Sequence, residues 1–365
     1  MTRSRSLLER LAKILSYIVF ITWALITILP LFWMGYSSFK TNEELVRDIY
    51  KLPRELILHQ SHEFLVIERT LNVMLPYDPD QDPRERIIIE STSIAPTRRL
   101  MVYFLIREDM PPEIQGLSPG DRIELRDLPL FTRTRIGWQM IWFNYISAFV
   151  RGGLGGKFFN SLLYAGVGTF LIVIFGLMIG FALAKLGFPK ISRFISVIIG
   201  LGYLLSINSV IIPLFLLLRS VGLTDSHLGI ILVYTAFGLP MSVLLSTQFI
   251  KGLPNSLLES AYIDGAGVFR TFWSILLPMT VPVIITISII NALGIWNEFL
   301  LVLVLASSES TKSLPVGVFS FSSLTSQQLG WQIAALVIAV VPAIVVYFSF
   351  SKQLTQGVVG GAIKG

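Results

Sequence analysis

Six stretches of about 20 mostly apolar residues constrain this chain most, because a helix needs about 20 such residues to cross roughly 30 Å of hydrocarbon. They run over residues 14–36, 160–184, 194–218, 228–250, 279–304 and 330–350. Only 14% of the 365 residues are charged, against about 25% in soluble proteins. The sequence therefore excludes an aqueous globular protein and predicts an all-α polytopic membrane protein with six transmembrane helices.

A polar insertion separates the first two stretches. Residues 40–158 hold 16 of the 29 basic and 17 of the 23 acidic residues, a near balance that favours an ordinary solvated surface and no nucleic-acid partner. Alternating, β-branched runs separated by turn-forming Pro, Gly and Asp predict a small β-rich extracytoplasmic domain here, with its core over about 54–135. The chain thus divides into a first segment over 1–39, the insertion over 40–158 and a five-helix core over 159–365.

The basic residues of the short loops predict the orientation. Eleven Lys and Arg residues lie in the short segments on the side of the two termini, against two on the other side. Because cytoplasmic loops carry the excess of positive charge, both termini are expected in the cytoplasm. The insertion then faces outward, and the loop over 251–278 faces the cytoplasm.

The sequence offers few residues of the types that usually carry out catalysis or bind metals. There is no cysteine, which excludes thiolate metal sites and a cysteine nucleophile, and there are three histidines. The glycine-rich segment 152–158 resembles a phosphate-binding loop but has one residue too few, and Phe158 stands where Ser or Thr should hold magnesium. We expect no catalytic, cofactor-binding or metal-binding residue in the chain, and ATP must be handled by another subunit.

The cytoplasmic loop has the pattern of a short docking helix. Pro254 suits a helix start, and an apolar stripe of Leu257, Leu258, Ala261 and Tyr262 repeats at spacings of three and four. Gly265 then supplies a break before helical patterning resumes. A helix that exposes small and apolar residues to the cytoplasm is expected to dock into another protein.

The same loop carries a resemblance to a known family. Glu259-Ser260-Ala261, three residues, Gly265, nine residues and Ile275-Leu276-Leu277-Pro278 resemble the EAA loop of binding-protein-dependent ABC importer permeases, with Ser260 in place of the usual second alanine. The resemblance implies a type I permease whose loop grips a cytoplasmic ATPase and transmits its motion to the pore. The implied coupling residues are Glu259, Ser260, Ala261, Asp264, Gly265, Ile275, Leu277 and Pro278.

Further segments resemble the maltose-type carbohydrate permeases, among them Trp296-Asn297-Glu298-Phe299 and the terminal Gly360-Gly361-Ala362. That resemblance implies a subunit of the bacterial inner membrane that forms half of a pore for an oligosaccharide or related polyol. The implied partners are a second homologous permease, a cytoplasmic ATPase dimer that holds ATP and magnesium, an extracytoplasmic solute-binding protein and membrane lipid.

Polar residues late in the fifth apolar stretch are candidates for the substrate path, because polar groups inside a span usually face the bundle interior or a wet cavity. An aromatic ring beside amides also suits the apolar faces and hydroxyls of a sugar. An equally open alternative is that Trp296 anchors the helix at the membrane interface while the amides bond neighbouring helices. The candidates are Asn291, Gly294, Trp296, Asn297 and Glu298.

Three other functions compete with this interpretation. An importer permease for a non-sugar solute would have the same loop. An ion-coupled secondary transporter would place ionisable residues near the midplane, where Glu298 is the one candidate. A membrane-anchored sensor would leave both the number of spans and the cytoplasmic loop unexplained.

Overall fold

The computed structural model describes residues 2–40, 42–53, 64–67, 86–91, 98–103, 122–124, 129–131, 134, 138, 141–186, 189–321 and 328–362. The chain forms two compact units. The first comprises Met1–Gly152 and Phe321–Ile338, and the second comprises Gly153–Ser320 and Ala339–Gly365. Both candidate sites of the sequence lie in the second unit.

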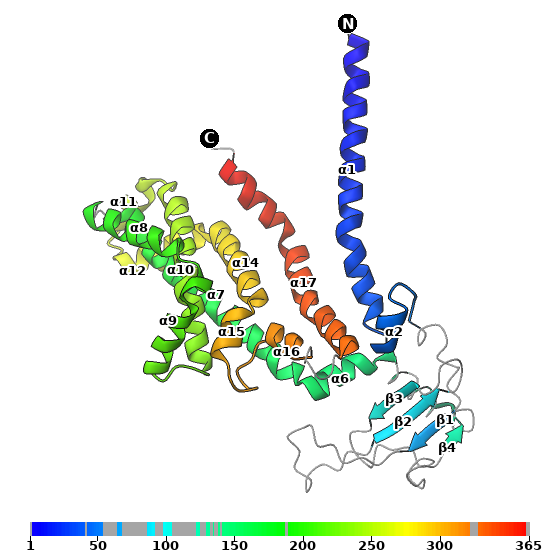
Figure 1. Ribbon diagram of the computed structural model, residues 1–365. Helices are drawn as coiled ribbons and strands as arrows, with labels where there is room; N and C mark the ends of the chain where they lie inside the picture. Colours follow the sequence, from blue (N-terminus) through cyan, green and yellow to red (C-terminus); the bar gives the residue numbers. More distant parts are fainter. Residues whose placement is uncertain are drawn as a thin grey trace. The chain divides into compact units, whose positions relative to one another are not determined.

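Three long helices form the centre of the second unit. α7 (Leu154–Lys185) packs most extensively against α10 (His227–Lys251) and next against α14 (Val281–Asn297), which run alongside it in Figure 1. α8 (Pro189–Tyr203) and α9 (Ile207–Ser220) connect α7 to α10. After α14 come α15 (Leu300–Leu305), α16 (Leu314–Ser320) and α17 (Leu329–Ala362).

Two glycines allow α7 and α10 to approach closely. The hydroxyl of Ser246 donates to the carbonyl of Gly176 at 2.8 Å, and the hydroxyl of Ser242 donates to the carbonyl of Ile172 at 3.1 Å. A Cβ atom on Gly176 would lie 2.0 Å from the Ser242 hydroxyl, and one on Gly180 would lie 2.3 Å from the Ser246 hydroxyl. The G-x-x-x-G pair of this helix therefore serves close helix packing, as such pairs do in membranes.

In the first unit, hydrogen bonds join α1 (Thr2–Ser37), α2 (Asn42–Arg47), α6 (Phe143–Gly152) and the start of α17. The amide of Asn144 on α6 donates to the carbonyls of Ser38 and Lys40, each at 2.7 Å. The side chain of Asn42 accepts from the backbone N–H of Gly330 at 2.9 Å. One end of α1 is therefore fixed to segments from distant parts of the sequence.

The six predicted spans correspond to four straight helices and two bent pairs. Glu9–Ser37, Leu154–Lys185, His227–Lys251 and Leu329–Phe350 are each long and apolar enough to cross a membrane. The third predicted span is instead two helices bent by 100° after Tyr203, and the fifth is preceded by a bend of 77° between Met279 and Val281. The described chain therefore has four straight candidate spans, or up to six when each bent pair counts as one.

The bends have local causes that hydropathy does not register. Ser206, between α8 and α9, is extended (φ −71°, ψ 132°). Thr280 closes the preceding helix, since its hydroxyl donates to the carbonyl of Leu277 at 3.0 Å, and Pro282 has no N–H to continue the helical bonding. A second interruption follows α14 at Glu298, which is again extended (φ −73°, ψ 132°).

The predicted β-rich domain is not supported. The described chain is overwhelmingly helical, and most of the range 54–135 lies outside the described residues. Within that range the structure describes four short antiparallel segments in the order β3-β2-β1-β4: β1 (Phe64–Ile67), β2 (Arg86–Ser91), β3 (Arg98–Tyr103) and β4 (Arg122–Glu124). Because the described chain is otherwise helical, the fold class is corrected to helical.

Candidate functional site

The helix expected in the cytoplasmic loop is present as α11 (Asn255–Ile263). Its buried side chains are Leu258 and Ala261, which are three residues apart and so lie on one face. Leu257 and Tyr262, predicted for the same stripe, are 39% and 44% exposed. The inward face is therefore narrower than the sequence pattern indicated, and part of the apolar stripe remains available at the surface.

Gly265 ends this helix in a left-handed turn. Its φ is +74°, its N–H donates to the carbonyl of Tyr262 at 3.0 Å, and the N–H of Ala266 donates to the carbonyl of Ala261 at 2.9 Å. This pair of bonds is the Schellman arrangement, which favours glycine because other residues are strained at positive φ. The glycine predicted as a break is thus the turn that fixes where the chain leaves α11.

The remaining polar residues of the motif face away from the core. Glu259, Ser260 and Asp264 are all exposed. The backbone N–H of Asp264 donates to the carbonyl of Ser260 at 3.0 Å and so completes the last turn of the helix. The structure therefore brings these residues together on one short exposed segment and leaves their side chains available to a partner.

Two side chains near the end of α7, Lys185 and Phe181, attach the coupling loop (residues 251–278) to this helix. The ammonium of Lys185 donates to the carbonyl of Leu253 at 2.7 Å and to the side-chain oxygen of Asn255 at 2.5 Å. The rings of Phe181 and Phe272 lie 6.0 Å apart, and Phe272 is 3% exposed. Sequence reasoning missed Lys185 and Phe272, since a single Lys and a single Phe give no periodic signal.

The segment between α11 and α14 is helical but irregular. α12 (Val268–Thr271) is followed by a π-helical turn, η3 (Phe272–Leu276), and then by α13 (Leu277–Met279). Ile275 and Leu277 are partly buried, Pro278 is exposed, and Leu276 is 2% exposed. Wide turns of this kind occur often at functional positions in helices, and no sequence pattern predicts this one.

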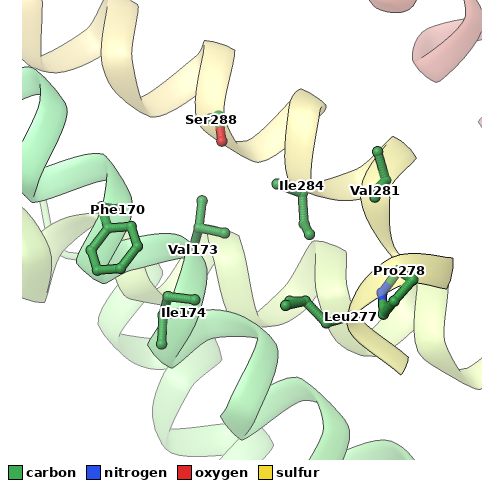
Figure 2. A pocket seen from close by; sticks show the side chains of 8 residues that line it. All are labelled: Phe170, Val173, Ile174, Leu277, Pro278, Val281, Ile284 and Ser288. Atoms are coloured by element: carbon green, nitrogen blue, oxygen red, sulfur yellow. The ribbon is translucent and has the colours of Figure 1, made fainter. Parts of the chain in front are cut away.

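Leu277 and Pro278 also border an apolar cavity of about 380 Å³. Figure 2 shows them beside Val281, Ile284 and Ser288 of α14, with three residues of α7 opposite. The lining residues from α7 are Phe170, Val173 and Ile174. Among all the lining residues, Ser288 has the one polar side chain. The cavity lies where the coupling loop bends into α14.

Three large apolar side chains of the coupling loop are exposed. Ile263 is 85% exposed and Phe269 is 72% exposed, with Trp273 at 49%. Exposed apolar clusters of this kind are typical of protein–protein contact sites. The segment therefore combines a fixed turn, an attachment to α7 and an uncovered apolar surface.

The candidate path residues of α14 divide into two groups. Trp296 is 6% exposed, donates from its indole nitrogen to the carbonyl of Ala339 at 3.0 Å and packs edge-on against Phe158 at 5.5 Å. The carboxylate of Glu298 accepts from the Tyr234 hydroxyl at 2.9 Å and from the N–H of Leu301 at 2.8 Å. These two side chains join helices together.

Of the other three candidates, two are more accessible than Trp296 and Glu298. Asn297 and Gly294 are exposed, and Asn291 is partly buried. Both amides donate within their own helix, Asn291 to Ile287 at 2.9 Å and Asn297 to Leu293 at 2.8 Å, which leaves their acceptor oxygens for other partners. A substrate contact on α14 is therefore easier to place at these three positions.

A polar network that sequence reasoning missed surrounds Asp225, in the loop between α9 and α10. One carboxylate oxygen accepts from the N–H of Ser307 at 2.9 Å, from the N–H and hydroxyl of Ser308 at 3.0 Å each, and from the Thr311 hydroxyl at 2.5 Å. Asp225 is also the one described non-glycine residue at positive φ, 52°. The carboxylate ties two loops of the second unit together.

The first turns of α7 hold the same loop from its other side. The Tyr164 hydroxyl donates to the carbonyl of Thr311 at 2.7 Å, and the amide of Asn160 donates to the carbonyl of Ser310 at 2.6 Å. The ammonium of Lys157 pairs with Glu309 at 2.7 Å. Because Tyr164 and Lys185 are 21 residues apart on α7, this network and the coupling loop are separated by about 30 Å, the thickness of a bilayer core.

The network shifts the acidity of its two carboxyl groups. Hydrogen bonds, first from Thr311 and then from the N–H of Ser308, hold the pKa of Asp225 below its usual range. Burial alone would raise the pKa of Glu309, but hydrogen bonds from Lys157 and Lys312 outweigh it and the pKa is lowered. Lowered pKa values favour the ionised carboxylate form of both Asp225 and Glu309.

A scan against protein-family models matches residues 140–360 to one family, described as the binding-protein-dependent transport system inner membrane component. The matched range contains α11, the bend before α14 and the Asp225 network.

Curated relatives match the same part of the chain. The diacetylchitobiose uptake system permease protein NgcG of Streptomyces coelicolor is 33% identical over 223 residues, which is 60% of this chain and 74% of the relative. The arabinooligosaccharides transport system permease protein AraQ of Bacillus subtilis is 33% identical over 223 residues, covering 61% of this chain and 78% of the relative.

Among solved structures, the chain is similar to one from a bacterial ABC transporter involved in the import of the acidic polysaccharide alginate. The TM-score is 0.61 at 17% sequence identity, and the match covers 94% of this chain and 96% of that chain. At this identity the likeness concerns the fold.

Proposed function

We propose a carbohydrate-import function from the premise that this chain belongs to the family of binding-protein-dependent transport system inner membrane components, whose model matches residues 140–360. Members of the family are permease subunits of ABC importers, and the chain is a transport subunit rather than an enzyme. In the proposal it forms half of a translocation pore for an oligosaccharide or related polyol. The names of its relatives, which refer to diacetylchitobiose and arabinooligosaccharides, support that substrate class.

The family requires an ATPase and a solute-binding protein as partners. We further propose that the complete importer contains a second homologous permease, two cytoplasmic ATPase subunits and one extracytoplasmic binding protein. ATP and magnesium reside in the ATPase pair. Both termini lie in the cytoplasm, since eleven of the thirteen basic residues of the short loops fall on their side.

The observation that carries the coupling part of the proposal is the exposed helix α11 ended by Gly265. The ATPase receives α11 and the apolar side chains of Ile263 and Phe269, which are 85% and 72% exposed. The fixed turn and the helical path through η3 then pass the motion to α14 as a rigid-body shift. Glu259, Ser260 and Asp264 supply the polar rim of that contact.

The substrate path is proposed along α14 at Asn291, Gly294 and Asn297. Trp296 and Glu298 act indirectly here, because their bonds to Ala339 and Tyr234 hold α14 in place. Amide groups suit the hydroxyls of a sugar, but they suit polar non-sugar solutes as well. An importer for a non-sugar solute is therefore the second candidate, and it differs only in this part of the proposal.

Reconstitution of the assembled importer in proteoliposomes tests the function. We expect ATP inside the vesicles to drive accumulation of a labelled oligosaccharide, with competition from other oligosaccharides and none from peptides or polyamines. Competition by peptides or polyamines alone would replace the substrate class and keep the importer. Uptake that survives removal of ATP and disappears with the ion gradient would instead show a secondary transporter.

A further inference from the structure

A collar of exposed apolar side chains surrounds the C-terminal end of α1. Tyr50 is 85% exposed, Trp138 63%, Leu52 57%, Ile49 41% and Trp142 39%. These five residues come from the first and last described parts of the insertion, where the sequence predicted an aqueous environment. A water-facing surface with two tryptophans and a tyrosine in one cluster is unusual and indicates a contact.

Hydrogen bonds fix the first half of this collar to α1. The indole of Trp33 donates to the carbonyl of Ile49 at 3.0 Å, and the hydroxyl of Tyr36 donates to the carbonyl of Tyr50 at 3.3 Å. The ammonium of Lys40, a residue that is 1% exposed, donates to the carbonyl of Ile49 at 2.6 Å. Ile49 and Tyr50 are therefore held at the level of the last turns of α1.

Ring contacts fix the second half at the same level. Phe39 lies 5.4 Å from Trp142 and 5.5 Å from Tyr145, measured between ring centroids. Trp138 is stacked on Trp142 at 6.5 Å with 7° between the ring planes. The hydroxyl of Tyr145 shares a hydrogen bond of 2.7 Å with that of Ser38. Segments about 90 residues apart thus meet at one end of α1.

The length of α1 sets the depth of the collar in a membrane. Its spanning part, Glu9–Ser37, has 29 residues, which is about 43 Å of helix and matches the roughly 40–45 Å of a bilayer with its headgroups. None of its most apolar window is buried inside the protein. Trp33, Tyr36 and everything bonded to them therefore lie at headgroup level.

We propose that this collar is a membrane-surface anchor that inserts into the headgroup and upper acyl region of the leaflet reached by the C-terminal end of α1. Tryptophan and tyrosine are enriched at that depth because their rings are apolar at one end and polar at the other. The collar continues the exposed apolar surface of α1, where Phe32 is 68% exposed. Lipid is thus the occupant that continuity with the spanning helix favours.

The absence of cysteine from the chain makes the test direct. Nitroxide labels are placed at Trp138→Cys and Leu52→Cys in the assembled importer, with cysteine-free partner subunits, in lipid nanodiscs. Oxygen, which partitions into lipid, and a water-soluble nickel complex compete to relax each label. Ser310→Cys, in an exposed polar loop, is the matched aqueous control.

At both collar positions we expect relaxation by oxygen to exceed relaxation by nickel, with the ratio reversed at Ser310. Leu52→Cys leaves the Trp138 and Trp142 stack intact, so it reports even if Trp138→Cys disturbs that stack. Nickel-dominated relaxation at either collar position would place the collar in water. Exclusion of both reagents would mean that another subunit covers it, and either result overturns the proposal.

Discussion

The two ends of α7 are held in different ways. At the N-terminal end, Asn160, Tyr164 and Lys157 each bond to the loop that Asp225 also holds, so that loop is fixed from two sides. At the C-terminal end, the coupling loop is attached through the ammonium of Lys185 and one ring contact. The difference indicates a rigid block at one end of the helix and a hinged element at the other.

The largest effect is expected at the turn of the hinged element. Gly265→Pro removes the N–H that bonds to Tyr262 and forbids the φ of +74°. We expect ATP-driven uptake to fall by about tenfold or more while ATP hydrolysis continues, since about 1.4 kcal/mol of lost bias between two states is already a factor of ten. Uptake and hydrolysis are measured together in proteoliposomes.

Gly267 supplies the matched control for that variant. Its φ of −72° is ordinary for any residue, and a Cβ atom there would meet nothing within 4 Å. Gly267→Ala should therefore transport normally. Full uptake by Gly265→Pro, or equal losses in both variants, would contradict the role assigned to the turn.

The next effect is expected in the rigid block. Asp225→Ala leaves the N–H groups of Ser307 and Ser308 without their acceptor and places alanine at a φ of 52°. We expect a loss of about 2–3 kcal/mol, because hydrogen bonds to charged groups contribute about 1.5–3 kcal/mol. The measurement is thermal unfolding of the purified importer.

Asp225→Asn keeps an acceptor oxygen and tolerates the left-handed conformation. It should therefore lose clearly less stability than Asp225→Ala. If the two variants unfold at the same temperature as the unsubstituted protein, the network does not stiffen this end of α7.

The pH dependence should be smaller and should have a definite sign. The pKa of Asp225 is lowered by the hydrogen bonds from Thr311 and Ser308, so its stabilising contribution is present above its ordinary pKa of about 4 and is lost as the pH falls below that value. Thermal unfolding measured from neutral pH downward should show this loss. In Asp225→Asn the dependence should be weaker, with the part due to Glu309 remaining.

The smallest effect is expected where the coupling loop meets α7. Lys185→Met removes the bonds to Leu253 and Asn255, which should cost about 1 kcal/mol locally. We expect faster amide hydrogen exchange in α11 with little change in global unfolding. Lys190→Met, which removes a charge from an exposed residue of α8, should leave α11 unchanged.

Sequence reasoning succeeded where one residue type has one physical use. The sequence predicts that Gly265 ends a helix, and it does so at a φ of +74°. The positions of the long spans also followed from hydropathy, because the bilayer fixes the length of an apolar helix.

The rest depends on partners that are distant in the chain. The residues next to Asp225 in the sequence do not indicate that its carboxylate accepts hydrogen bonds from groups about 80 positions later. Likewise, the indole of Trp296 bonds to a carbonyl of α17, which is distant in the sequence. Hydropathy averages over a window, so it reports the length of α8 and α9 together but not the 100° between them. The predicted β-rich domain is likewise not supported, since local alternation predicts strands one at a time and does not specify that they form a separate domain.

The serine hydroxyls between α7 and α10 limit how this protein can move. Ser242 and Ser246 are completely buried, and each donates to a carbonyl of the neighbouring helix. Sliding one helix past the other would break both of these bonds, although Ser246 also donates to the carbonyl of Val243 in its own helix at 3.2 Å, and it would move a side chain against the close approach at Gly176 and Gly180. We therefore expect α7 and α10 to move together as one rigid unit during transport. Opening of the pore would then occur where this pair meets other helices.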